Sequence, residues 1–336
     1  MSIVVVSLNP SIDWQLTAHS FVYGGLNRVQ AVGRYASGKG INVCAALKNM
    51  GLDLLCVGFN YQENGDIITN ALDEWDVCCD FVTVNGEVRT NIKLYDAASC
   101  KMTEFNQPGG NVSNEALEKF CCKIESLKNT QSNDSILVLS GSLPQGVPAD
   151  IYQRLCKSWP GIVILDAEGE SLCKALEGDR PPFCIKPNLF ELENCFGVKL
   201  ASKEDIIDFC HKLLQIYGAA NPKNKASLQA NASGLGMICV SMGAEGAVLV
   251  TSSTVYYLPG MELEVRGVQG AGDAMVAGLV YGLKSGASDA ELLKIASAAA
   301  AASITREGTQ MCTGTDFEKF LKTMPKPIEI RGHHNI

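Results

Sequence analysis

Short apolar runs alternate with amphipathic segments over most of this chain. The apolar runs are rich in β-branched residues and have the length of buried strands, whereas the segments between them repeat their apolar positions with the period of a helix. Strands are predicted at residues 3–8, 54–58, 136–140, 162–166, 183–186 and 237–241. Helices are predicted at residues 42–50, 67–75, 116–127, 151–158, 189–196 and 203–217. Apolar strands that alternate with helices predict an α/β fold with a mostly parallel central sheet flanked by helices.

Two stretches depart from this alternation. Residues 13–35 and 87–105 carry short β-like patterns with no helix between them, and they predict a small antiparallel flap over the site. After residue 257 the chain becomes helical, with helices predicted at 271–284, 289–305 and 316–323. Residues 218–234 have the polar composition of a surface loop, and residues 331–336 are predicted to be a frayed tail.

Size and charge narrow the possible functions. The 336 residues, 46% of them hydrophobic, suffice for one large α/β domain or two small ones. The formal net charge is -8 and no block of Lys and Arg occurs, so nucleic acid is not expected as a partner. No window reaches the roughly 18 apolar residues of a membrane helix, and the N-terminus does not resemble a signal peptide. The 14 Cys and 4 His form no zinc pattern, so we expect reduced thiols in a cytoplasmic protein.

The segment Gly270-Ala271-Gly272-Asp273 carries the strongest chemical signal. It directly precedes an apolar helical run, and its small residues allow backbone N–H groups to converge on an anion at the helix N-terminus. The positive potential there keeps Asp273 ionised, so its carboxylate can accept a hydroxyl proton beside an anion hole. A glycine-rich helix start capped by Asp273 is the structural alternative for the same residues.

A second glycine-rich segment, Ser37-Gly38-Lys39-Gly40-Ile41-Asn42, is close to the P-loop pattern. That pattern requires Ser or Thr after the lysine to hold magnesium, and Gly40 stands there instead. We interpret the segment as a turn that brings the backbone near a ligand, with Lys39 and Asn42 as polar handles. A solvent-facing lysine in a turn is the alternative.

Polar residues also follow the predicted strands, where ligands of parallel sheets bind. Ser140 and Asp166 each end a strand. Asn188 and Glu191 follow another strand, and their spacing of three predicts that they share a helix face and hold Mg²⁺ through water. Each of these residues taken singly is more often a cap or a turn.

Cations occur in the two flap-like stretches. Arg28, Arg89 and Lys93 lie there, and an acidic protein needs such local cations to bind a phosphate. A surface ion pair is the alternative for each of them. Other chemistries have less support, because no GxGxxG follows the first strand, no GxSxG occurs and the His residues lack a patterned partner.

Taken together and in this order, the motifs resemble those of the ribokinase-like sugar kinases, specifically the phosphofructokinase B group. The resemblance extends from about residue 3 to 321. Within the group the chain is most similar to 1-phosphofructokinases and tagatose-6-phosphate kinases. The group motifs are Gly-Lys-Gly-Ile-Asn at 38–42, Lys-Pro-Asn-x-x-Glu at 186–191, Val-Ser-Met-Gly-Ala-Glu-Gly-Ala at 240–247 and Gly-Ala-Gly-Asp at 270–273, and the subgroup segments are 8–13, 27–29, 89–93, 106–109 and 140–144.

The resemblance implies a single ribokinase-like domain over residues 1–336, with a β-sheet lid at about 13–36 and 87–106 that commonly mediates a homodimer. It implies an ATP- and Mg²⁺-dependent kinase of a ketohexose phosphate. The expected reaction converts fructose 1-phosphate to fructose 1,6-bisphosphate, or tagatose 6-phosphate to tagatose 1,6-bisphosphate.

The resemblance also assigns roles to matching positions. Asp273 is the expected base, and Gly270, Ala271 and Gly272 form the expected anion hole. The residues expected to bind the sugar phosphate are Asp13, Gly38, Asn42 and Ser140 on the sugar and Arg28, Lys39, Arg89 and Lys93 on the phosphate. The residues expected to contact ATP are Lys186, Asn188, Ser241, Gly243, Gly246 and Gly272, with Asn188 and Glu191 organising Mg²⁺.

One departure from the family lies directly before the anion hole. Val268-Gln269 occupies the place where the family usually has Thr-Val, which removes a hydroxyl near the nucleotide. Two other functions stay open at this point. One is a ribokinase-like kinase of a free sugar or a nucleoside, and the other is a sugar-phosphate-binding regulator without turnover.

Overall fold

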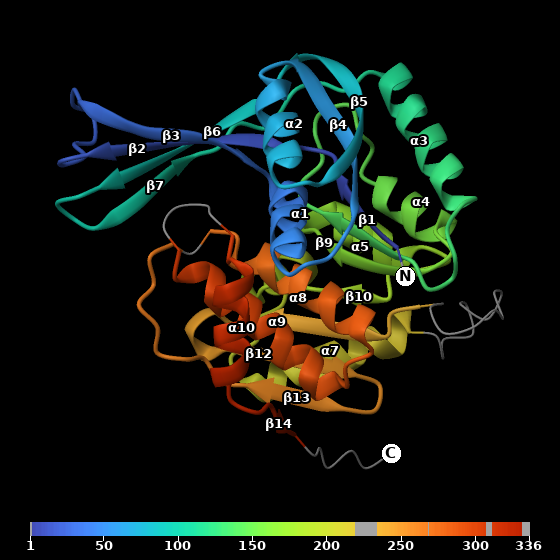
Figure 1. Cartoon of the computed structure of the whole chain (residues 1–336). Coiled ribbons are helices and arrows are strands. Elements are labelled where there is room, and N and C mark those ends of the chain that lie inside the picture. Colours follow the sequence, from blue (N-terminus) through green and yellow to red (C-terminus); the bar gives the residue numbers. More distant parts are fainter. Residues whose placement is uncertain (1, 219–233, 268, 307–310, 331–336) are drawn as a thin grey trace.

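The central element of the fold is a ten-stranded sheet. The computed structural model describes residues 2–218, 234–267, 269–306 and 311–330. The strands of this sheet are β1 (Ile3–Ser7), β4 (Leu55–Glu63), β5 (Cys78–Glu87), β8 (Ile136–Ser140), β9 (Ile162–Asp166), β10 (Cys184–Ile185), β11 (Met237–Ser241), β12 (Ala247–Thr251), β13 (Val255–Leu258) and β14 (Ile328–Glu329). Their spatial order is β14-β13-β12-β11-β10-β9-β8-β1-β4-β5 (Figure 1). Pairing is parallel from β5 to β11 and antiparallel from β11 to β14, so the predicted mostly parallel sheet is confirmed.

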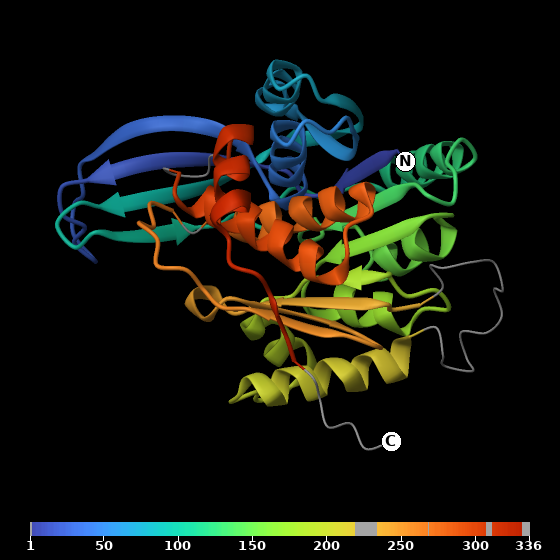
Figure 2. The same cartoon turned by 60° about the horizontal axis from the view of Figure 1, so that its bottom comes forward.

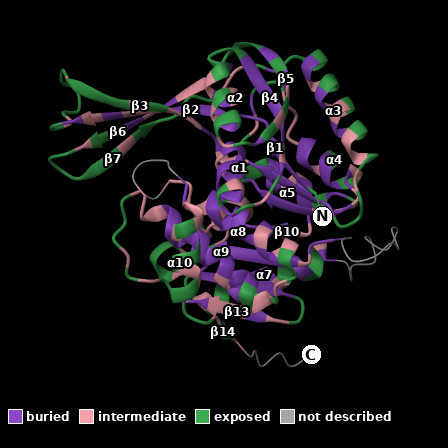
Figure 3. Cartoon of the chain, viewed as in Figure 1, coloured by how far each residue is buried: buried purple, intermediate pink, exposed green. Residues whose placement is uncertain are grey.

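Helices pack on both faces of this sheet. They are α1 (Lys39–Asn49), α2 (Gly65–Glu74), α3 (Asn114–Lys128), α4 (Ile151–Ser158), α5 (Gly169–Glu177), α6 (Leu189–Phe196), α7 (Lys203–Tyr217), α8 (Ala271–Ser285), α9 (Asp289–Ile304) and α10 (Gly314–Thr323). α1, α8 and α9 contact one face, and α3 to α7 lie on the other (Figure 2). Buried residues therefore fill the sheet and the inner helix faces (Figure 3). Every residue of β1 and β8 is buried, as expected of strands covered on both faces.

A smaller, four-stranded sheet extends away from the central one (Figures 1 and 2). It consists of β2 (Ser11–Ala18), β3 (Val29–Ser37), β6 (Arg89–Asp96) and β7 (Lys101–Phe105), in the order β3-β2-β6-β7. The predicted antiparallel arrangement is wrong in one respect, because β2 and β6 pair in parallel. β2 follows β1 and β6 follows β5, and these two strands of the parallel sheet run in the same direction. Their continuations therefore leave the same edge side by side.

Local signals placed most of the remaining elements correctly. The predicted α4, α6 and α7 agree with the structure at both ends, and capping boxes begin α6, α7, α9 and α10. The sequence patterns did not identify α5 or the strands β5, β12, β13 and β14, and they placed the start of α1 at Asn42 although the helix begins at Lys39. Most of the predicted loop at 218–234, and all of the predicted tail at 331–336, lie outside the described residues.

Two exclusions concern the described ranges only. None of their helices is long and apolar enough to cross a bilayer. The 14 cysteines all lie within these ranges and are all free.

Candidate active site

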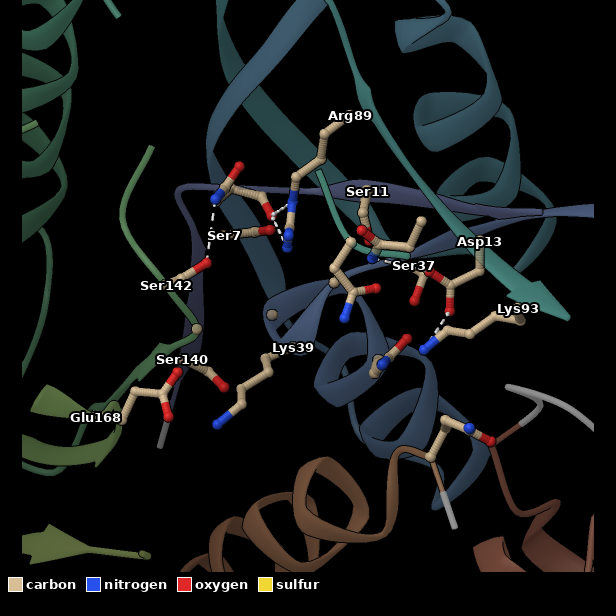
Figure 4. A pocket seen from close by; sticks show the side chains of 18 residues that line it. Ser7, Ser11, Asp13, Ser37, Lys39, Arg89, Lys93, Ser140, Ser142 and Glu168 are labelled. Atoms are coloured by element: carbon tan, nitrogen blue, oxygen red, sulfur yellow. Dashed lines mark hydrogen bonds and ion pairs between the residues drawn. The ribbon is translucent and has the colours of Figure 1, made fainter. Parts of the chain in front are cut away.

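A polar cavity of about 310 Å³ lies where the small sheet meets the carboxyl ends of β1 and β8. β1 and β8 end in Ser7 and Ser140, and Lys39 begins α1 on the same edge. In Figure 4, Asp13 and Lys93 of the small sheet point toward one another on one side, and Lys39 lies near Ser140 and Glu168 on the other. The predicted residues that line the cavity are Asp13, Gly38, Lys39, Asn42, Arg89, Lys93 and Ser140.

Paired charges line the side of the cavity that the small sheet forms. Lys93 Nζ lies 2.7 Å from Glu104 Oε2 and 3.9 Å from Asp13 Oδ2. Asn91 Nδ2 donates to Asp13 Oδ1 at 3.2 Å. Burial raises the pKa of Asp13, although Lys93 and the hydrogen bonds from Ser37 and Asn91 act in the opposite direction. Asp13 is thus a buried carboxylate in the wall of the cavity, with the positive charge of Lys93 beside it.

Asp166 is the centre of a second charged cluster. This buried carboxylate at the end of β9 lies 3.3 Å from Lys39 Nζ and 3.5 Å from Lys186 Nζ, and it accepts from Ser140 Oγ at 3.4 Å. Burial by itself favours the neutral acid, but the two lysines outweigh it and hold the pKa of Asp166 below its ordinary value. Glu191 Oε1 lies 3.4 Å from Lys39 Nζ, and carboxylates in turn raise the pKa of Lys39. Asp166 therefore positions two lysines at the carboxyl ends of the parallel strands.

Asp273 lies buried in the first turn of α8, and its environment suits a proton acceptor. Burial and the nearby Asp166 raise its pKa to about 6, whereas Lys39 and a hydrogen bond from Asn42 lower it. That bond, from Asn42 Nδ2 to Asp273 Oδ2, measures 2.8 Å and joins α1 to α8. A carboxyl group with a pKa of about 6 is ionised at neutral pH and binds a proton more tightly than an ordinary aspartate. The predicted pairing of Asn42 and Asp273 in one site agrees with this geometry.

The turn before α8 exposes backbone N–H groups near a lysine. Gly270 adopts a φ of 74°, which favours glycine, and it begins the helix. A Cβ atom placed on Gly272 would lie 3.3 Å from Lys186 Nζ, so this lysine borders the turn. A helix N-terminus next to an ammonium group is suited to bind an anion.

The family follows from comparison with known proteins. The model of the pfkB family carbohydrate kinases matches residues 2–316. The chain belongs to this family. A 1-phosphofructokinase of Bacillus subtilis (strain 168) is 34% identical over 284 residues, covering 84% of this chain and 85% of the relative. The 1-phosphofructokinase of Escherichia coli (strain K12) is 32% identical over 308 residues, covering 90% of this chain and 91% of the relative.

A solved structure confirms the expected ribokinase-like fold of this pfkB kinase. The crystal structure of phosphofructokinase-2 from Escherichia coli in complex with substrates and products has a TM-score of 0.85 at 24% identity. The similarity covers 96% of this chain and 99% of that chain. The chain is thus an ATP-dependent carbohydrate kinase, with ATP as its phosphoryl donor.

The nucleotide side of the pfkB kinase site differs from the sequence prediction at Asn188. This residue is the N-cap of α6 and is not on a helix face with Glu191. Asn188 Oδ1 accepts from Glu191 N at 2.7 Å, and Glu191 Oε2 accepts from Asn188 N at 2.9 Å. Asn188 Oδ1 is engaged in this capping box, whereas Glu191 Oε1 lies outside the box and 3.4 Å from Lys39 Nζ. Mg²⁺ commonly needs only one or two carboxylates together with phosphates and water, so Glu191 fits a water-mediated site.

The other predicted nucleotide contacts surround the end of β11. Ser241 ends this strand and forms an isolated parallel bridge with Asn188, which brings the two predicted ATP contacts side by side. Gly243 and Gly246 flank the 3₁₀ turn η2 (Gly243–Glu245), both with positive φ. Val268, the family departure, lies outside the described residues.

Arg28 is the predicted site residue that the structure leaves apart from the others. It is exposed in the connection between β2 and β3 and does not line the cavity of its own chain. Sequence reasoning also assigned no role to several residues that do line it. Gln269, one of these residues, gave only the signal of a family departure. Asp166 does not line the cavity but pairs with its Lys39, and it gave only the weak signal of an acid at a strand end. The cavity-lining residues without a predicted role are Ser7, Asn9, Ser11, Ser37, Gly40, Asn91, Asn106, Gly141, Ser142, Glu168 and Gln269.

Proposed function

We propose that this pfkB kinase phosphorylates a ketohexose phosphate, with fructose 1-phosphate as the first candidate and tagatose 6-phosphate as the second. One observation carries the proposal. The buried Asp273, with a pKa of about 6, lies at an anion-binding turn and is linked through Asn42 to a polar cavity that contains Arg89. The names of the 1-phosphofructokinase relatives support the choice of sugar phosphate.

Unpaired polar atoms favour a sugar in this cavity. Asn9 Oδ1, Ser11 Oγ and Asn91 Oδ1 are buried and have no hydrogen-bond partner among the described residues. All three residues line the cavity. A buried acceptor without a partner costs free energy, which a ligand rich in hydroxyl donors recovers on binding. A polyhydroxylated substrate fits that requirement.

Arg89 is the best candidate for the phosphate that the substrate already carries. Its guanidinium donates to the backbone carbonyls of Asn9, at 3.1 and 3.3 Å, and of Gln107, at 3.2 Å. Lys39 and Lys93, the other cations of the cavity, each face two carboxylates. Among the described cavity residues Arg89 is therefore the cation least committed to an acidic side chain, and we assign it the leading role at the phosphate.

The proposed mechanism is in-line transfer of the γ-phosphoryl group of ATP to a sugar hydroxyl. Asp273 accepts the hydroxyl proton, and the amides of Gly270–Gly272, with Lys186 beside them, stabilise negative charge on the transferring phosphoryl oxygens. Mg²⁺ held through water at Glu191 would supply further charge neutralisation on the nucleotide phosphates. Asn42 orients the Asp273 carboxylate, since its amide donates to Oδ2.

The kcat of this kinase should fall below pH 6, because Asp273 then becomes protonated and can no longer act as the base. Because Asp273 must be ionised to accept a proton, kcat is expected to be flat from about pH 7 to 8 and to approach a tenfold loss per pH unit below about 6. The measurement is kcat with both substrates saturating, because a sugar phosphate has a second pKa of about 6 that affects KM. Constant kcat down to pH 5 would contradict the role of Asp273.

The small sheet is proposed as a lid that also mediates a homodimer. Large apolar side chains are exposed on it, including Tyr23 at 95%, Leu26 at 83% and Val32 at 56%. Such a patch indicates a protein–protein contact. Arg28 lies in the same connection as Tyr23 and Leu26, so it reaches a phosphate only in a cavity supplied by a second copy. Light scattering that gives the mass of a monomer would contradict the dimer.

The cytoplasmic location stays a prediction.

A substrate panel tests the proposed function. We expect ADP release to be fastest, as kcat/KM, with fructose 1-phosphate or tagatose 6-phosphate, and at least tenfold slower with ribose or a nucleoside. A preference for ribose or a nucleoside would favour the free-sugar or nucleoside kinase instead. Tight binding of a sugar phosphate without ADP release would favour the regulator.

A further inference from the structure

A series of side-chain contacts joins the small sheet to the turn that precedes α8. Gln269 Nε2 donates to Glu104 Oε1 at 2.9 Å. The other carboxylate oxygen of Glu104, Oε2, lies 2.7 Å from Lys93 Nζ. Lys93 in turn lies 3.9 Å from Asp13, the carboxylate expected to bind the sugar (Figure 4). Gln269 immediately precedes Gly270, so the series connects the sugar pocket to the anion-binding turn.

The series joins three strands of the small sheet to the body of the molecule. Asp13 lies in β2, Lys93 in β6 and Glu104 in β7, and all three strands belong to the small sheet. Gln269 belongs to the body of the molecule and lines the sugar pocket. Its hydrogen bond to Glu104 joins β7 to the turn before α8.

The charges show why a neutral donor suits this position. Lys93 already faces the carboxylates of Asp13 and Glu104, so the series carries one negative charge in excess. An amide donates to Glu104 without adding charge of either sign, and it leaves Lys93 committed to Asp13. Burial acts to raise the pKa of Glu104, but hydrogen bonds from Lys93, Gln269 and Asn106 outweigh it and hold this pKa below its ordinary value. Glu104 therefore stays ionised and keeps these partners. A valine, usual at this position in the family, cannot donate.

We infer that Gln269 is a positioning residue that holds the small sheet against the anion-binding turn and thereby sets the sugar pocket relative to Asp273. The inference rests on the proposed function of that pocket. Gln269 acts through Glu104 and need not touch the transferred group. Its contribution belongs to the closed arrangement in which the sugar hydroxyl and the phosphoryl group meet.

Gln269→Val tests this inference, because it removes the donor and keeps a side chain that the family accepts. We expect KM for the sugar phosphate to rise roughly threefold to tenfold, as for the loss of one partly exposed hydrogen bond, while KM for ATP changes less than twofold. ATP hydrolysis without sugar should become a larger fraction of total ADP release, since the lid then excludes water less well. Gln30→Ala is the matched control, because Gln30 is exposed on β3 of the same sheet. Unchanged KM and hydrolysis in Gln269→Val would overturn the inference.

A charge exchange separates the hydrogen bond from simple packing. Gln269→Glu sets two carboxylates against each other and should raise KM for the sugar phosphate above that of Gln269→Val at pH 8. Adding Glu104→Gln restores a donor–acceptor pair, so the double variant should recover part of this loss. No recovery would indicate that Gln269 acts only by its bulk and would overturn the inference.

Hydrogen exchange provides a readout that does not depend on the substrate. Backbone amides of β7 (Lys101–Phe105) should exchange several-fold faster in Gln269→Val than in the wild type, whereas amides of β8 should not change. Faster exchange in a chain that lacks kinase activity would leave the inference standing and remove the proposed function. Normal kinase activity in Gln269→Val, with unchanged exchange and KM, would overturn the inference and leave the proposed function standing.

Discussion

Replacing Asp273 with Asn is expected to lower kcat by roughly 10²–10⁴-fold, the range for a positioned general base, while the fold is retained. Asparagine has the same shape, so it can still accept the hydrogen bond that Asn42 donates at 2.8 Å. It cannot accept a proton from the sugar hydroxyl. The measurement is ADP release at pH 8 with saturating fructose 1-phosphate and ATP. Turnover within about threefold of the wild type would show that Asp273 is not the base.

The stability of the same variant distinguishes a catalytic residue from a structural one. The pKa of Asp273 is about 6 in the folded chain and near 3.8 in the unfolded chain, so its ionised form costs folding free energy above pH 6. That cost disappears as the pH falls below 4. Asp273→Asn should therefore raise the free energy of unfolding at pH 8 by about 1–3 kcal/mol, and by little at pH 4. Asp66→Asn is the control, because Asp66 occupies the first turn of α2 but is exposed.

Local sequence signals predicted the helix start that carries Asp273 and much of the fold. Gly270 and Asp273 mark a helix start within four consecutive residues, and the structure shows that start, with a positive φ at Gly270. The starts of α6 and α7 could also be predicted from a local signal, because each helix begins with a capping box. At Asn188 the spacing to Glu191 was interpreted as a shared Mg²⁺ site with a cap or a turn as the alternative, and the structure shows the cap. The metal role stays a prediction.

Features that depend on distant pairs could not be predicted in this way. Asn42 and Asp273 are 231 residues apart, Lys39 and Asp166 are 127 apart, and Gln269 and Glu104 are 165 apart. No local period or turn pattern encodes such contacts. Only the family resemblance placed the first pair in one site, and it offered nothing for the other two. The parallel pairing of β2 with β6 has the same origin, since it depends on the common direction of β1 and β5.

The resemblance also carried over Arg28 on the basis of its neighbours in the sequence, and the structure separates it from Arg89. Both were expected at one phosphate, yet Arg28 is exposed and Arg89 lines the cavity. Arg28 lies in the connection between β2 and β3, and its sequence neighbours do not determine where that connection ends up relative to the cavity. Of the two arginines, only Arg89 lines the cavity of its own chain, which is why we propose it as the main phosphate contact there.

Replacing Arg89 with Ala is expected to raise KM for the sugar phosphate by roughly 10²-fold, because removal of one partner of a desolvated charge pair, here the half-buried Arg89 and the bound phosphate, commonly costs about 2–5 kcal/mol of binding. Burial lowers the pKa of Arg89, which shows that its charge is already partly desolvated before a phosphate binds. KM for ATP should stay within about twofold, since Arg89 contacts the sugar side of the cavity through Asn9 and Gln107. The measurement is KM for each substrate with the other one saturating.

Controls decide whether the Arg89 effect reflects the phosphate. Arg154→Ala removes an arginine that pairs with Asp150 on the surface of α4, and it should leave both KM values unchanged. Arg89→Lys keeps the charge but loses the fork of donors, so it should recover only part of the affinity. Ribose, which carries no phosphate, should lose far less from Arg89→Ala than fructose 1-phosphate does. Equal losses for the two sugars, or for sugar phosphate and ATP, would show that Arg89 supports the backbone at Asn9 and does not bind the phosphate.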